Sequence, residues 1–152
     1  QLLEQLGTSE RGVITGLVTI LVDGDDMNEP VADAARSILD GHIVLDRKLA
    51  HQGHFPAINV LGSASRLFND VTTAEQQRSV SKVRRVLAKY GEVEDLIQIG
   101  AYQKGAMRES DQAVAALPSV TNFLRQPINS PSPFADTLRG LTDLDRIIEQ
   151  QR

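Results

Sequence analysis

The chain of 152 residues contains no cysteine and no tryptophan, and aromatic residues make up only 4% of it. Without cysteine, disulfide frameworks, thiolate zinc sites and cysteine nucleophiles are excluded. No apolar run approaches the roughly 20 residues that cross a bilayer, and we find no signal peptide. A GxxxxGK[ST] motif is also missing, so this chain by itself forms no P-loop. We therefore expect a cytoplasmic protein without cysteine chemistry.

The composition is that of a globular protein, with 41% hydrophobic and 24% charged residues. The formal net charge is −4, which argues against a general nucleic-acid binder because neutralising phosphates needs a basic surplus. The length fits a single domain or two small packed subdomains.

The first part of the chain has the pattern of an α/β fold. Residues 13–22, VITGLVTILV, predict a strand that is covered on both faces in a parallel sheet. Pro30 suits the first turn of a helix, and apolar residues follow it at helical spacing. The expected elements are a strand over 13–22, a helix over 30–39, a strand over 42–46, a short helix over 47–53 and an extended segment over 56–63. This alternation predicts a parallel sheet.

After Arg66 the pattern becomes wholly helical, and we expect a boundary near residue 70, with an α/β core over 1–70 and a helical domain over 71–152. We expect Gly91 to interrupt a helix and Pro118 to separate two short ones. A basic stripe occupies one helix face: Arg78, Lys82, Arg85 and Lys89. It is either a solvated face or a contact for an acidic partner.

Three aspartates, Asp23, Asp25 and Asp26, follow the predicted strand at the end where open α/β sheets place their ligands. They fit a structural or switch loop, and they also fit a site for a hard cation or a catalytic water. The spacing of a calcium loop is absent.

Motifs of other hydrolases are missing. The three histidines, His42, His51 and His54, lack the HExxH spacing of a zinc helix, and Ser63 and Ser65 do not form a GxSxG elbow. We therefore interpret these histidines as satisfied or solvated side chains and exclude a serine hydrolase of that type.

Arg66 ends a stiff segment, GHFPAINVLGSASRLF, that contains a proline bend, an apolar run and a turn of small residues. The arginine is either an ordinary surface residue or a guanidinium held ready for a phosphate or carboxylate. The residues alone leave both interpretations open.

The segment LVDGDDMNEPVADAARSILDGHIVLDRKLAHQGHFPAINVLGSASRLF closely resembles the C-terminal half of the flagellar and type III secretion export ATPases, relatives of the rotary ATP synthase head subunits. The resemblance continues through LAKYGEVEDLIQIGAYQKGAMRESDQAV to FLRQP and covers roughly residues 10–127. GDDMNEP is more similar to the flagellar branch than to the injectisome branch. The resemblance implies part of a RecA-like, parallel-sheet ATPase core followed by a small helical domain.

The resemblance also implies roles for two residues. Arg66 matches the arginine finger, which reaches from one subunit into the nucleotide site of its neighbour. Phe55 matches an aromatic residue that stacks on adenine in the subunit's own site. Tyrosine is common there, and phenylalanine keeps the π face while losing the hydroxyl.

Two loops are assigned by the same resemblance. The one that carries Asp23, Asp25 and Asp26 is similar to a segment that shifts with nucleotide state. The other occupies the place of a loop that meets the central stalk, and its candidate contacts are Lys104, Arg108 and Glu109. The acidic run of the relatives is mostly absent from that loop, which argues against a purely acidic contact.

In this family the P-loop, the Mg²⁺-binding aspartate, the catalytic glutamate and an N-terminal β-barrel precede the region that this chain resembles. We therefore expect a C-terminal fragment that is inactive alone. Its parent is expected to be a homo-hexamer that hydrolyses ATP with Mg²⁺ to drive protein export. The expected partners are a stalk protein, export substrates and chaperones, with no nucleic acid and only indirect membrane contact through the export gate. A non-catalytic module that docks a partner through its helical end remains the alternative, and a ring helicase is a weaker one.

Overall fold

The computed structural model describes residues 6–22, 24 and 29–151. The chain divides into two compact units, one ending at His42 and the other beginning at Ile43. Among the described residues, no helix has both the length and the hydropathy that crossing a bilayer requires.

The first unit begins with a short antiparallel hairpin. Strand β1 (Gly7–Ser9) pairs with β2 (Gly12–Ile14), with Gly7 opposite Ile14. The prediction of one long buried strand over 13–22 is wrong, because residues 15–22 have no regular structure and Leu17 is 96% exposed. A central strand needs hydrogen-bonded neighbours on both edges and cover on both faces, and the described residues supply neither to this segment.

Helix α1 (Pro30–Ile38) forms where its sequence predicts it, with Pro30 at its first position. Proline is favoured there because its ring fixes φ and the missing N–H group would have no partner in the helix. Ala32 and Ala35 are its buried residues. Leu39 caps the C-terminal end of the helix, and its N–H group donates to the carbonyl of Ala35.

The second segment of α/β structure is a strand–helix–strand hairpin. It consists of β3 (Gly41–Leu45), α2 (Arg47–His51) and β4 (Ile58–Ser65), and β3 pairs with β4. The N–H of Asp46 donates to Ala57 O at 2.8 Å, and the N–H of Val44 donates to Ser63 Oγ at 3.0 Å. Asp46, directly after β3, thus bonds near the start of β4, whereas the earlier residue Val44 bonds near its end. The two strands therefore run in opposite directions rather than in the expected parallel order. The connection is a short helix that stops before Gly53, whose φ of +67° suits glycine, and it turns the chain straight back.

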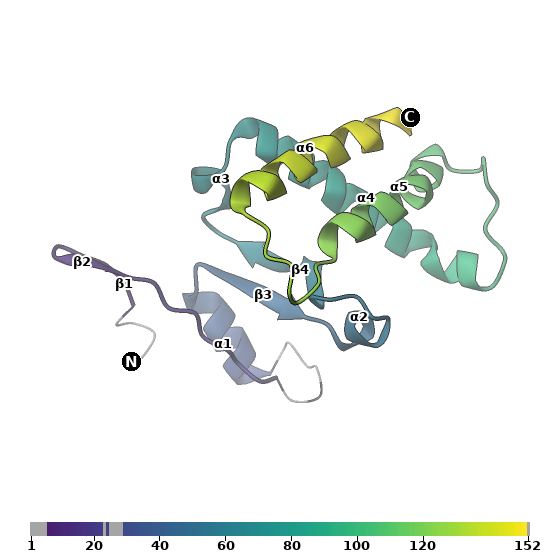
Figure 1. Ribbon diagram of the computed structural model, residues 1–152. Helices are drawn as coiled ribbons and strands as arrows, with labels where there is room; N and C mark the ends of the chain where they lie inside the picture. The colour runs from purple at the N-terminus through teal and green to yellow at the C-terminus, as the bar shows by residue number, and fades with distance from the viewer. Residues whose placement is uncertain (1–5, 23, 25–28, 152) are drawn as a thin grey trace. The chain divides into compact units, whose positions relative to one another are not determined.

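From Phe68 onward every regular element of the described chain is a helix. Helix α3 (Phe68–Val71) precedes three long helices, α4 (Ala74–Gln98), α5 (Arg108–Leu124) and α6 (Phe134–Gln150), which pack against one another (Figure 1). Helix α4 starts with a reciprocal capping box between Thr73 and Gln76, a strong local signal for a helix start. The buried core lies between the three helices: Val83, Val86, Ala113, Ala116, Val120 and Leu144.

Two expected helix breaks do not occur. Gly91 lies inside α4 and Pro118 lies inside α5. Each is followed two residues later by a fully buried valine, Val93 or Val120. A glycine inside a helix costs about 1 kcal/mol and a proline about 3 kcal/mol, while burying one such side chain recovers roughly 1.5–3 kcal/mol. Tertiary burial therefore carries both helices through the weak position.

Candidate functional site

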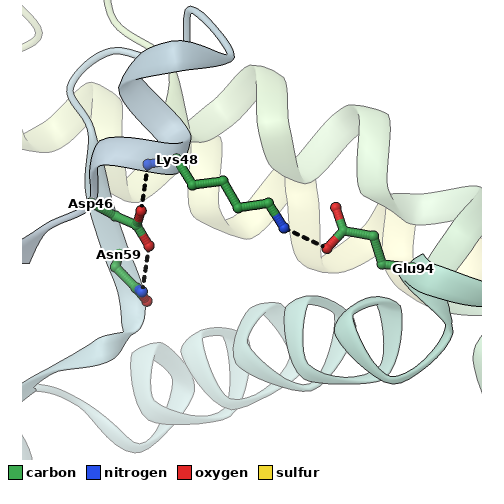
Figure 2. A network of polar contacts seen from close by, with 4 residues as sticks. All are labelled: Asp46, Lys48, Asn59 and Glu94. Carbon is green, nitrogen blue, oxygen red and sulfur yellow. Dashed lines mark hydrogen bonds and ion pairs between the residues drawn. The ribbon is translucent and has the colours of Figure 1, made fainter. Parts of the chain in front are cut away.

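Asp46 fixes the hairpin that leads to Arg66. Its Oδ1 accepts from the N–H of Lys48 at 2.8 Å and caps α2, while its Oδ2 accepts from Asn59 Nδ2 on β4 at 3.1 Å. The ammonium group of Lys48 in turn lies 3.0 Å from Glu94 Oε2 on α4, and this pairing raises the pKa of Lys48 (Figure 2). One carboxylate thus ties the two strands and the short helix together, and Lys48 joins them to the helical bundle.

Arg84 of α4 makes a second connection to β4. Its Nη1 donates to Val60 O at 2.6 Å, its Nη2 donates to Leu61 O at 3.2 Å, and a longer 3.5 Å contact joins Nη1 to Ser63 O. The sequence analysis did not single out Arg84, since nothing local distinguishes it from the other basic residues of this helix. One feature sets Arg84 apart in the sequence: it does not belong to the basic stripe, which occupies positions 78, 82, 85 and 89.

Arg66 lies in the two-residue turn between the end of β4 and the start of α3, and it is exposed. Phe55 precedes the same strand and is 52% exposed. Eight strand residues separate the two positions. At about 3.3 Å per residue this strand is roughly 23 Å long from Ile58 to Ser65, so Phe55 and Arg66 lie at its opposite ends.

The loop that carries Phe55 is held from both sides. Its carbonyl accepts from the N–H of Gln126, just after α5, at 2.9 Å, and the N–H of His54 donates to Leu49 O at 2.9 Å. His54 is buried, and burial followed by the nearby Arg125 charge lowers its pKa. The Phe55–Pro56 peptide bond is cis. The two hydrogen bonds hold the backbone on either side of Phe55, which is half-exposed.

The basic stripe of α4 is partly neutralised within the chain. Lys82 Nζ lies 2.7 Å from Asp145 Oδ1 and 2.5 Å from Glu149 Oε1 on α6, and hydrogen bonds to these two carboxylates raise its pKa. Lys89 contacts Glu92 at 3.0 Å and Glu109 at 3.8 Å. Two of the four stripe residues, Lys82 and Lys89, thus meet acidic side chains of their own chain. The pocket beside it has a volume of about 80 Å³, too small for a nucleotide.

The loop between α4 and α5 is organised by Asp111. The Tyr102 hydroxyl donates to Asp111 Oδ1 at 2.7 Å, and the N–H of Gly105 donates to Oδ2 at 2.9 Å. The first of these bonds raises the pKa of Tyr102. Three exposed charges lie on or beside this loop: Lys104, Arg108 and Glu109.

The remaining candidates are dispersed. Asp23, Asp25 and Asp26 lie outside the described residues. The Ser63 hydroxyl donates to Asn59 O at 2.6 Å and accepts from Val44, which makes it a hairpin contact. Within residues 6–22, 24 and 29–151, no three His, Asp or Glu side chains gather where they could share a metal ion.

Two family models match consecutive parts of the chain. Residues 1–65 match the nucleotide-binding domain of the ATP synthase alpha/beta family, and residues 72–143 match the T3SS EscN ATPase C-terminal domain. The chain is 49% identical over 144 residues to the flagellum-specific ATP synthase of Bacillus subtilis and covers 33% of that protein. It belongs to the family of flagellar and type III secretion ATPases. The predicted resemblance to the flagellar and type III secretion export ATPases is thereby confirmed.

Relatives from the secretion branch are equally similar. The SPI-2 type 3 secretion system ATPase of Salmonella typhimurium is 53% identical over 126 residues, which are 83% of this chain and 29% of that protein. Assembled EscN from enteropathogenic E. coli has a TM-score of 0.89 at 40% identity, over 95% of this chain and 35% of that one. EscN solved with its central stalk EscO has a TM-score of 0.83 at 39% identity, over 95% of this chain and 34% of that one.

These neighbours confirm the expected fold class, an α/β nucleotide-binding portion followed by a helical C-terminal domain. The chain spans about a third of the length of the curated relatives it matches, and it matches their C-terminal portion.

Proposed function

We propose that this chain acts as the C-terminal portion of a protein-export ATPase, whose identical subunits form a hexameric ring that hydrolyses ATP to drive export. The division into a nucleotide-binding part over 1–70 and a helical domain over 71–152 belongs to this proposal. Two family models that meet between residues 65 and 72 support it. The flagellar branch stays a prediction, since relatives of both branches match at similar identity.

The observation that carries the proposal is the placement of Arg66 and Phe55 at opposite ends of one anchored strand. The strand between the two residues is roughly 23 Å long, and this separation suits two nucleotide sites on either side of a subunit boundary. In the proposed arrangement Phe55 stacks on adenine in its own subunit. Arg66 enters the site of the neighbouring subunit.

The chemistry assigned to Arg66 is electrostatic. A guanidinium delivered to the γ-phosphate neutralises charge that develops in the transition state, and a finger in trans is worth on the order of 10³–10⁵ in rate. Position matters, because a misplacement of about 1 Å costs on the order of 10²-fold. An anchored strand that ends directly before Arg66 meets that requirement.

Mg²⁺ accompanies ATP in the proposed reaction, but the described residues do not form a site for it, because no group of three carboxylate or imidazole side chains converges there. We therefore assign no step of the metal chemistry to these residues. The proposal keeps Asp23, Asp25 and Asp26 as a loop that shifts with nucleotide state.

The proposed partners are further copies of the subunit, a central stalk protein, export substrates and chaperones, with a cytoplasmic location and only indirect membrane contact. EscN has been solved as an assembled ATPase and with the stalk EscO, which supports the first two partners. The exposed loop with Lys104, Arg108 and Glu109 is the proposed stalk contact. Mixed signs of charge at that loop favour a contact that is not purely acidic.

The test uses full-length ATPase in which Arg66→Ala subunits are mixed with subunits whose P-loop lysine has been replaced. Each variant alone is expected to be inactive. In a mixed ring, an intact Arg66 from one subunit completes the intact P-loop site of its neighbour, so turnover returns. If turnover stays absent while native mass confirms mixed rings, the trans role of Arg66 is refuted and a non-catalytic docking module becomes the better explanation.

A further inference from the structure

One side chain of the helical domain, Arg84, binds the backbone of the strand that leads to Arg66. The guanidinium of Arg84 on α4 reaches the carbonyls of Val60 and Leu61 at 2.6 and 3.2 Å, and Ser63 O lies 3.5 Å away. These carbonyls precede Arg66 by three to six residues. Arg84 thus binds the backbone of β4 close to the point where the strand delivers the finger.

A second contact joins the hairpin to the same helix. Lys48 in the same hairpin pairs with Glu94, which lies ten residues after Arg84 on α4. Ten helical residues span about 15 Å, so the hairpin is attached to α4 at two separate points. Of these two points, Arg84 is the one bonded to β4 itself, and its contacts lie closer in sequence to Arg66.

We propose that Arg84 is a positioning residue, which holds β4 so that Arg66 reaches the neighbouring subunit's nucleotide in the reactive position. This inference rests on the proposed function of Arg66. Arg84 does not touch nucleotide in this role and acts only through the strand.

The chemistry of the side chain fits the role. The planar guanidinium presents several N–H groups in a fixed fork and satisfies neighbouring carbonyls at once. A lysine ammonium at the same place is a flexible point charge and cannot reproduce the fork. Arg85, the next residue, carries the same charge but is exposed, which makes it a matched control.

The first measurement compares Arg84→Met, Arg84→Lys and the control Arg85→Met in full-length ATPase. Arg84→Met is expected to lower kcat about 10- to 100-fold with the Kd for ATP unchanged, since the bound finger is displaced by an ångström or so. Arg84→Lys should fall between Arg84→Met and the wild type, and Arg85→Met should retain wild-type kcat. Wild-type kcat in Arg84→Met, or a loss of ATP binding equal to its loss of turnover, would overturn the inference.

The second measurement separates positioning from damage to the fold. Arg84→Met subunits are mixed with subunits that lack the P-loop lysine, beside the same mixture made with Arg66→Ala. If Arg84 acts through Arg66, both mixtures regain turnover, because the Arg84→Met subunit still hydrolyses ATP when a neighbour donates an intact finger. A merely misfolded subunit would not hydrolyse ATP there.

The outcomes distinguish the two ideas. Recovery with Arg66→Ala but not with Arg84→Met overturns the positioning role and leaves the proposed function standing. Absence of recovery in both mixtures, with mixed rings verified by native mass, overturns both.

Discussion

Replacing Phe55 by alanine tests the adenine site directly. The side chain is 52% exposed, and the loop backbone is held by Gln126 and Leu49, so truncation should remove the ring without moving the loop. Stacking of one base on an aromatic ring is worth about 1–3 kcal/mol, which corresponds to a roughly 5- to 150-fold weaker Kd. We expect Phe55→Ala in full-length ATPase to weaken ATP binding by that factor, with kcat at saturating ATP nearly unchanged.

The assay is equilibrium titration with a fluorescent ATP analogue, followed by turnover at saturation. Phe55→Tyr keeps the π face and should bind ATP as the wild type does. Phe134→Ala removes an exposed phenylalanine from α6, at 74% exposure, and controls for the loss of a surface ring. An unchanged Kd in Phe55→Ala, or a loss confined to kcat, would refute the stacking role.

Two further predictions concern stability and are measured by urea unfolding of the 152-residue chain. Leu144→Ala leaves a cavity between the three long helices and should lower the free energy of unfolding by about 3 kcal/mol. The control Ile128→Ala, at a position that is 98% exposed, should lower it by less than about 0.5 kcal/mol. Equal losses in the two variants would contradict the assigned core. The pKa of His54 is lowered by burial and by Arg125, so its neutral form stabilises the fold. The contribution of His54 to the free energy of unfolding should therefore be fully present above about pH 6.5. It should be lost as the pH falls through the lowered pKa of His54 in the folded protein. His54→Gln should flatten this pH dependence, with the same change at exposed His51 as the control, and an unaltered slope would count against it.

Local signals in the sequence predicted several elements correctly. Pro30 starts α1 and Gly53 follows the short helix α2, because both residues restrict or permit particular backbone angles wherever they occur. The strand expected over 13–22 failed because apolar, β-branched residues form a buried strand only beside other strands. The described residues provide none at 15–22.

The helix breaks expected at Gly91 and Pro118 do not occur, and here tertiary packing favours structure where local propensity opposes it. Their local cost is real, but burial of side chains such as Val93 and Val120 offsets it in part or in full. Local signals therefore located the start of α1 at Pro30, but they failed at Gly91 and Pro118, where both helices continue.

The sequence by itself determined the family, and it identified Arg66 and Phe55 as the residues to test, because the motifs around them are contiguous in the chain. Only the tertiary structure decided what holds those residues in place. Arg84 meets Val60 from 24 residues away, and Lys82 meets Glu149 from 67 residues away. Such pairings depend on how the helices pack, and no local pattern of residues encodes them.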